Sequence, residues 1–94
     1  MRRIIPILLL WAGAALAEPI DAAREAFVKG EYRKAIALAR PEVARAPGKA
    51  WQVIGASGCF LKDRATALEA YGHLDAHGQD FLRYVCSRND LTIP

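Results

Sequence analysis

Two cysteines and two histidines are the side chains of this sequence best suited to chemistry. Cys59 and Cys86 are the only cysteines and stand 27 positions apart. No C-x-x-C pair lowers a thiol pKa locally, so catalytic thiol redox chemistry is disfavoured. An even number of cysteines predicts a structural disulfide between them if the chain is exported to an oxidising compartment. Closing a loop of about 28 residues would stabilise the fold by roughly 3.5 kcal/mol.

The histidines, His73 and His77, stand four residues apart on a predicted helix. This spacing can present two imidazoles to one metal ion, and Asp75 and Asp80 are near in sequence. Without a third firm ligand, solvated histidines at a helix end marked by Gly78 are the favoured interpretation. The alternative function that stays open is an exported metal-binding or thiol-redox helical protein that uses His73, His77, Cys59 and Cys86.

Other catalytic patterns are weak or missing. The segment 55–58 (Gly-Ala-Ser-Gly) is only superficially similar to a serine-nucleophile elbow, because no strand precedes it and the second glycine is misplaced. The sequence has no paired carboxylates, phosphate-cradling glycine loop or C-x-x-C-H haem motif. We therefore expect a protein that is not an enzyme and has no catalytic residues, cofactor or metal.

The first seventeen residues, Met1 to Ala17, are typical of a cleaved export signal. Arg2 and Arg3 form a basic start, an apolar core follows, and Ala15-Leu16-Ala17 is a small-x-small cleavage site. The apolar run covers 14 residues, short of the roughly 20 that a membrane-spanning helix needs. We expect cleavage after Ala17, a periplasmic or secreted location, and contact with the membrane only during export.

Removal of this segment changes the charge of the protein. The whole sequence carries +3, but the part after Ala17 has 11 basic and 10 acidic residues, a net charge of +1. Its basic residues are interleaved with glutamates, which is typical of a solvated helix face. Nucleic acid is therefore not an expected partner.

The 77 residues after the signal permit one small domain, residues 18–94, and its pattern is helical. Alternating β-branched and aromatic runs are absent, whereas alanine is abundant and apolar residues recur at helical spacing. Pro41 predicts a kink or restart, and Ala46-Pro47-Gly48 predicts a firm break. The predicted fold class is all-α, with about five helices over residues 21–29, 31–46, 50–61, 63–76 and 79–88.

The spacing of Trp51, Ile54, Gly55, Ala67 and Tyr71, W-x2-I-G-x11-A-x3-Y, resembles the tetratricopeptide repeat, a helix-turn-helix of about 34 residues. Upstream, Gly30-Glu31-Tyr32, Ala35-Ile36 and Pro47 are similar to the end of a preceding repeat. Ala35 and Ala67 would be equivalent positions 32 residues apart. Helix 79–88 would then be a capping helix.

The resemblance implies a non-catalytic scaffold for protein–protein interaction, with a peptide-binding groove lined by the first helix of each pair. Its groove-facing candidates are Gln52, Ala56, Cys59 and Phe60. For Phe60 and Trp51 we expect a position in the core rather than a role as binding hot spots. The implied partner is an unknown protein or peptide of the cell envelope, and oligomerisation is possible because the groove of fewer than three repeats is short.

Overall fold

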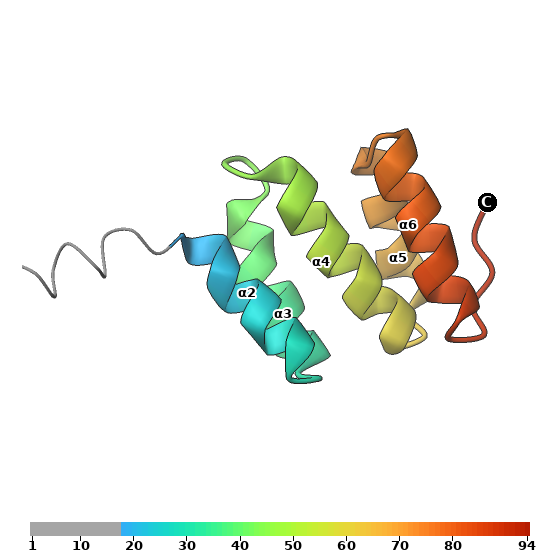
Figure 1. The fold of residues 1–94 in the computed structure, drawn as a ribbon, viewed down its shortest axis with the longest axis horizontal. Coiled ribbons are helices and arrows are strands. Elements are labelled where there is room, and N and C mark those ends of the chain that lie inside the picture. Colours follow the sequence, from blue (N-terminus) through green and yellow to red (C-terminus); the bar gives the residue numbers. More distant parts are fainter. Residues whose placement is uncertain (1–17) are drawn as a thin grey trace, which may run out of the picture.

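The computed structural model describes residues 18–94, and this part of the chain is a small all-helical domain (Figure 1). The predicted export signal, Met1–Ala17, lies outside the described residues. The five α-helices and one 3-10 turn are α2 (Pro19–Val28), α3 (Tyr32–Ala39), η1 (Arg40–Glu42), α4 (Pro47–Phe60), α5 (Arg64–His73) and α6 (Ala76–Ser87).

Prolines and one glycine set several of the helix ends. Gly30 follows α2 with φ of +81°, a left-handed conformation that glycine adopts at low cost. Pro41 ends α3, and the chain continues as η1, which confirms the predicted interruption. Pro19 and Pro47 are the first residues of α2 and α4. Both helices therefore begin two to three residues before the predicted starts, because proline at the first helical position loses no hydrogen bond.

The junction between the last two helices differs from the prediction. We expected a helix over 63–76, but α5 ends at His73 and Leu74 is extended, with ψ of 151°. The carboxylate of Asp75 accepts a hydrogen bond from the backbone N–H of Gly78 at 2.9 Å and caps α6. Gly78 is therefore buried inside the first turn of α6 and does not mark a helix end.

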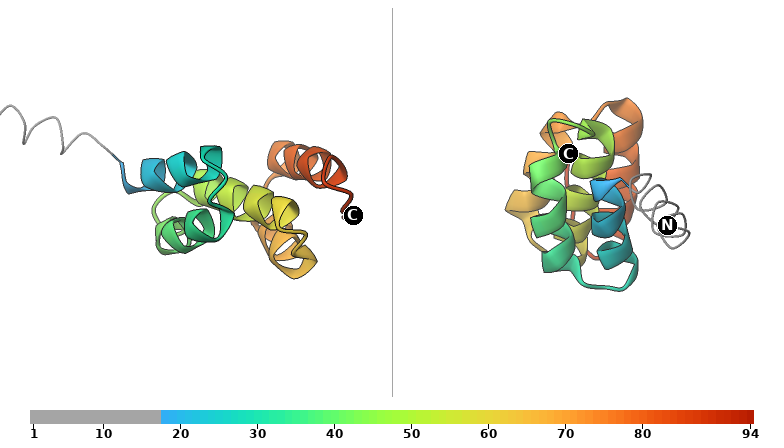
Figure 2. Two further views of the ribbon diagram at one scale, coloured as in Figure 1. Left: turned by 90° about the horizontal axis from the view of Figure 1, so that it is seen from below. Right: turned by 90° about the vertical axis from the view of Figure 1, so that its left-hand side faces the viewer.

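Two helical hairpins and a fifth helix form two layers. Figure 1 shows α2, α4 and α6 running in one direction and α3 and α5 returning in the other. In the left view of Figure 2, α2 and α6 form the upper layer and flank α4, whereas α3 and α5 lie in the layer below. Extensive contacts join only helices that are at most two apart in the chain. The arrangement makes α4 the centre of the domain.

Small residues bring the helices close together at this centre. The core is rich in buried alanines, and Ile20, Ile54 and Leu82 are its largest fully buried side chains. A Cβ atom at Gly55 would lie 2.9 Å from Cβ of Ala70 on α5 and 2.8 Å from Cδ1 of Leu82 on α6. Gly55 is thus the point where α4 contacts both later helices, and a larger side chain would push them away.

A disulfide joins α4 to α6. Cys59 and Cys86 are bonded and fully buried, with their Cα atoms 4.6 Å apart. The predicted bridge is therefore confirmed, and it attaches the last helix covalently to the preceding hairpin. No helix among residues 18–94 is long and apolar enough to cross a membrane.

The C-terminal tail, residues 89–94, is fixed to the domain through its backbone carbonyls. The Lys62 ammonium donates to the carbonyl of Asn89 at 2.8 Å, and the Arg64 guanidinium donates to that of Thr92 at 3.2 Å. Ile93 is buried against the core. The tail therefore packs on the domain although it has no helical pattern.

Candidate partner-binding groove

The large apolar side chains that residues 18–94 leave exposed gather on one face. They are Val28 on α2, Phe60 on α4, and Phe81 and Tyr84 on α6, with exposed fractions of 83%, 40%, 42% and 62%. Single exposed apolar residues are common in folded domains, but a contiguous group of them marks an interaction surface. These four lie on the three helices that run in parallel, and all of them line the two hollows described next.

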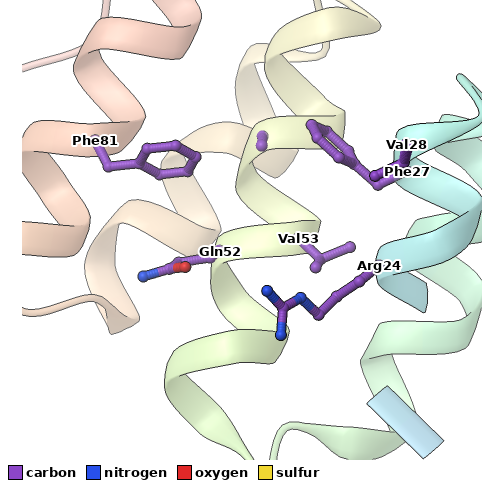
Figure 3. Close-up of a pocket in the computed structure, with 7 residues that line it drawn as sticks. Arg24, Phe27, Val28, Gln52, Val53 and Phe81 are labelled. Carbon is purple, nitrogen blue, oxygen red and sulfur yellow. The ribbon is translucent and has the colours of Figure 1, made fainter. Parts of the chain in front are cut away.

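The first hollow lies over the middle of α4. Figure 3 shows Phe27 and Phe81 pointing toward each other from α2 and α6, with α4 between them. Gln52 lies on the α4 side of the hollow, and the guanidinium of Arg24 reaches toward it from α2. The residues that line this hollow are Arg24, Phe27, Val28, Gln52, Val53, Ala56 and Phe81.

The second hollow continues the first toward the C-terminal end of α4. Phe27 and Phe81 belong to both hollows, so together they form one groove between α2 and α6 with α4 as its floor. The residues that line the second hollow are Phe27, Phe60, Phe81, Tyr84, Val85, Arg88 and Asn89. We refer to the two hollows together as the α2–α4–α6 groove.

Three aromatic rings stiffen the second hollow. Phe60 stacks on Tyr32 with ring centroids 4.6 Å apart, and Phe27 meets both rings edge-on at 5.6 Å. Such pairs hold rings in place beyond the effect of burial alone. The expectation that Phe60 is a core residue is therefore wrong, because the residue stays 40% exposed while its partners fix the orientation of its ring.

The predicted groove residues lie along one row of α4. Gln52 and Ala56 line the first hollow and Phe60 lines the second, as their four-residue spacing on a helix allows. Cys59 lines neither hollow, since it is buried in the disulfide. Trp51 is also buried and packs on the α5 side, where its indole stacks on His73 with ring centroids 4.1 Å apart.

The charge of the groove comes from two arginines. Arg24 lines the first hollow and Arg88 the second, and neither forms an ion pair within residues 18–94. The Arg88 guanidinium lies 6.0 Å from the centroid of the Tyr84 ring. The residues that line the two hollows include no aspartate or glutamate. The groove is therefore apolar at its centre and positive at its edges.

The two histidines do not lie on one helix, although the alternative metal interpretation required this. His73 is in the last turn of α5 and His77 in the first turn of α6, so they do not share a helix face. The cap at Asp75 separates them. Residues 18–94 contain no group of three or more histidine, cysteine or acidic side chains placed to hold a metal ion. The metal interpretation thus loses the geometry on which it was based.

The two cysteines, and the serine of segment 55–58, are buried inside the domain. Cys59 and Cys86 are paired and fully buried, which leaves no thiol for exchange at the surface. Ser57 lies within α4, fully buried, and its hydroxyl has no hydrogen-bond partner in the described structure. A substrate at the surface could therefore reach none of these three side chains in the folded state.

The shifted pKa values belong to groups outside the groove. Arg40 of η1 donates to both carboxylate oxygens of Glu69 on α5, at 2.9 and 3.2 Å, which lowers the pKa of Glu69 and raises that of Arg40. Hydrogen bonds from the hydroxyl and N–H of Thr66 lower the pKa of Asp63, which caps α5. These groups stabilise the second layer of helices and do not line the groove.

The walls of the groove were not identified from the sequence. Phe81, Tyr84 and Arg88 follow one another at positions i, i+3 and i+7, the spacing of one face of a helix. That spacing was a usable signal, because this row is separate from the buried row of Leu82 and Cys86. On α2, Arg24 and Phe27 show the same spacing of three.

Comparisons with protein-family models, with curated proteins and with solved structures give no match for this chain.

Proposed function

We propose that this protein is a small exported, non-catalytic binding module that holds a segment of another protein of the cell envelope in the α2–α4–α6 groove. The observation that carries the proposal is the location of the exposed large apolar side chains. All four of them in the described residues line this one groove. Exposed apolar surface is costly, and its concentration in a concave site is typical of binding surfaces.

The architecture supports a repeat-like scaffold. We infer that α2–α3 and α4–α5 are two tetratricopeptide-like hairpins and that α6 is a capping helix. Extensive contacts are confined to near neighbours in the chain, as in helical-repeat proteins. Ala35 of α3 and Ala67 of α5, the positions that the resemblance makes equivalent, are both fully buried. In such an array the first helix of each pair lines the concave side, which is the side of the groove here.

The groove is also built to bind without rearrangement. Its floor belongs to the central helix, and its α6 wall is attached to that helix by the disulfide. The stacked rings of Phe60 and Tyr32 hold part of the surface in one orientation. A preformed site loses less conformational entropy on binding, so a short groove can still give useful affinity.

The chemistry of the lining favours binding over catalysis. Among the side chains that line the groove are two arginines, a glutamine, an asparagine and a tyrosine, besides apolar groups. These side chains orient and recognise a ligand, whereas general acid–base or nucleophilic work typically uses histidine, cysteine or carboxylates. The buried disulfide supports an oxidising location outside the cytoplasm.

Affinity capture with groove variants tests the proposal. The full-length chain with its own leader and a C-terminal tag would be expressed, and the proteins retained from the cell envelope would be quantified by mass spectrometry. We expect a specific partner whose recovery falls about tenfold in Phe81→Asp and in Tyr84→Asp, because hot-spot aromatics dominate small interfaces. Both side chains are exposed, so neither variant should unfold the domain.

The matched control is Ala37→Asp, an exposed position on α3 outside the groove. It introduces the same charge and should leave recovery unchanged. Circular dichroism would establish that all three variants keep the wild-type helical content. Equal loss in the control, or no loss in either groove variant, would contradict the assignment of the groove as the binding surface.

A further inference from the structure

We propose that the segment bound in the groove has an apolar centre flanked by carboxylates. This inference rests on the proposed function and names the chemistry of its partner. It follows from the distribution of charge, the length and the shape of the groove, each of which restricts what can be bound.

The charge distribution selects an acidic partner. The floor helix α4 contains no aspartate or glutamate. On α6 the one carboxylate within the helix, Asp80, is paired with Arg83 and does not line the groove. On α2 the exposed carboxylates, Asp21 and Glu25, do not line it either. The charged side chains that line the groove, Arg24 and Arg88, are both positive and have no ion-pair partner within residues 18–94. Carboxylates on the partner would supply the missing charge and fit the fork of a guanidinium.

The placement of the two arginines sets the spacing of those carboxylates. Arg24 shares the first hollow with Gln52, and Arg88 shares the second with Phe60. Gln52 and Phe60 are eight residues apart on α4, which corresponds to about 12 Å along the helix axis. An extended segment covers that distance with about four residues and an α-helix with about two turns. The partner should therefore carry its acidic groups at least that far apart, because Arg24 and Arg88 also stand on opposite walls of the groove.

The part of the groove between the arginines selects apolar side chains. Phe27 and Phe81 form opposing walls, and Val53 and Ala56 form the floor beneath them. No charged side chain lines this central part, so a charged group held there would be left without a partner. One or two large apolar side chains would displace water from both rings.

The same shape disfavours two other occupants. A flat membrane surface would touch the exposed rims but would not reach the buried Val53 and Ala56 at the floor. Insertion of the C-terminal tail of a second copy is also disfavoured, because Ile93, the last apolar residue of that tail, is buried against its own core. Both occupants are nevertheless distinguishable in the experiment that follows.

The test begins with random heptapeptides displayed on phage and selected against the protein purified from the cell envelope. We expect the recovered sequences to be enriched in leucine, isoleucine or phenylalanine with aspartate or glutamate on either side. The dissociation constants of synthetic versions of these peptides would be measured by fluorescence anisotropy at 50 mM and 1 M NaCl. Arg24→Glu and Arg88→Glu should each weaken binding about threefold to tenfold at low salt. At 1 M NaCl the Debye length falls to about 3 Å, so the difference should nearly vanish.

The matched control is Arg33→Glu on α3, which changes the net charge equally but lies outside the groove. It should alter affinity by less than about twofold. Peptides with lysine in place of the carboxylates should prefer the Arg24→Glu and Arg88→Glu proteins over the wild type. Such a reversed preference for charge could not result from a loss of stability, which would weaken the binding of every peptide.

The outcomes separate the inference from the proposed function. Selected peptides that lack carboxylates, or equal weakening by Arg33→Glu, would overturn the charge assignment while the groove remained the binding site. Failure to recover any peptide whose binding Phe81→Ser weakens would overturn the groove itself. The wild-type protein would also be tested for binding to anionic lipid vesicles and for dimerisation by light scattering. If either is observed and Phe81→Ser abolishes it, the groove binds a membrane or a second copy, and the proposal of a peptide partner is wrong.

Discussion

At the scale of single residues, Gly55 is the position where three helices depend on the absence of a side chain. A Cβ atom there would lie 2.9 Å from Cβ of Ala70, which is fixed to the backbone of α5. Leu82 of α6 is equally close, at 2.8 Å from its Cδ1. Although glycine lowers helix propensity by about 1 kcal/mol, here it permits the contact that joins both later helices to α4.

Gly55→Ala and Gly72→Ala make a matched pair that measures this effect. We expect Gly55→Ala to lower the free energy of unfolding by about 1–3 kcal/mol, because the methyl group overpacks the core. Gly72 lies on α5, and a methyl group added there would meet nothing within 4 Å, so Gly72→Ala should raise stability by about 0.5–1 kcal/mol. Urea denaturation would measure both values. A stabilising Gly55→Ala would contradict the close approach of the three helices.

Ser57, two residues after Gly55 on α4, gives a prediction of the opposite sign: its replacement should stabilise the fold. Its hydroxyl is fully buried and has no hydrogen-bond partner in the described structure. Replacing it with alanine removes an unsatisfied polar group and leaves only a small void, so Ser57→Ala should stabilise by about 1 kcal/mol. Ser87→Ala is the control, since that serine is exposed and should change stability by less than about 0.5 kcal/mol. A clearly destabilised Ser57→Ala would mean that the hydroxyl has a partner.

At the scale of elements, the α6 wall of the groove depends on the disulfide. Replacing both Cys59 and Cys86 with serine removes the bridge without leaving a free thiol. On the chain-entropy account the loss is about 3.5 kcal/mol, a large share of the stability of a small domain. Thermal denaturation followed by circular dichroism would measure it. Because α6 carries Phe81 and Tyr84, peptide binding should weaken as well, and a double variant with unchanged melting and binding would contradict this role.

The contact between η1 and α5 gives the domain a defined response to acid. The pKa of Glu69 is lowered from its ordinary 4.5 by Arg40, and that of Asp63 from 3.8 by Thr66. Since both pKa values are lower in the folded state, these groups stabilise the fold above their ordinary values, and this stabilisation is lost as pH falls through the lowered values. The melting temperature should therefore decrease below about pH 4.5.

Glu69→Gln tests the contribution of the ion pair to this response. The variant should melt lower than the wild type at pH 7 and approach it at pH 3, because the carboxylate no longer contributes there. The effect should be small, since both side chains are more than two-fifths exposed and solvent screens the pair. Glu25→Gln on α2, at an exposed position without an ion pair in residues 18–94, should leave the difference between the two pH values unchanged.

Helix number and the disulfide were predictable from the sequence, whereas some helix ends were not. Apolar periodicity, Gly30 and Pro41 located the first three helices to within a few residues. The break before α6 was predicted about three residues too late, because Leu74 fits the apolar row of the preceding helix. The decisive interaction is the cap from Asp75 to the N–H of Gly78. The same residues can continue a helix or start one, and the packing of Leu74 on Gly78 favours the start.

The groove was predictable only in part for a related reason. The resemblance to a repeat indicated Gln52, Ala56 and Phe60, because these positions follow from spacing along one helix. Its walls require α2 and α6 to lie on either side of α4, and periodicity within a helix does not determine that arrangement. Two aromatic residues of α6 thus became recognisable as groove residues only once the helices were in place.

At the scale of the whole molecule, export predicts where the working chain begins. Cleavage after Ala17 would leave Glu18 at the N-terminus, directly before Pro19, the first residue of α2. An intact-mass measurement on protein recovered from the periplasm or culture medium should match residues 18–94 with two hydrogen atoms fewer for the disulfide. Retention of Met1 would contradict the signal-peptide assignment. An otherwise correct mass with both hydrogens present would contradict the bridge.

The stacking of Trp51 on His73 has a practical consequence for spectroscopy. Trp51 is the one tryptophan after residue 17, and it sits between α4 and α5, outside both hollows of the groove. Its fluorescence therefore reports the α4–α5 hairpin and does not respond to α6 as long as that hairpin stays folded. Circular dichroism, in contrast, reports the helical content of the whole domain, α6 included. If reduction of the disulfide lets α6 unfold alone, the circular dichroism signal will fall at a lower urea concentration than the shift in tryptophan emission. The difference between these two denaturation curves will measure how far α6 unfolds independently of the α4–α5 hairpin.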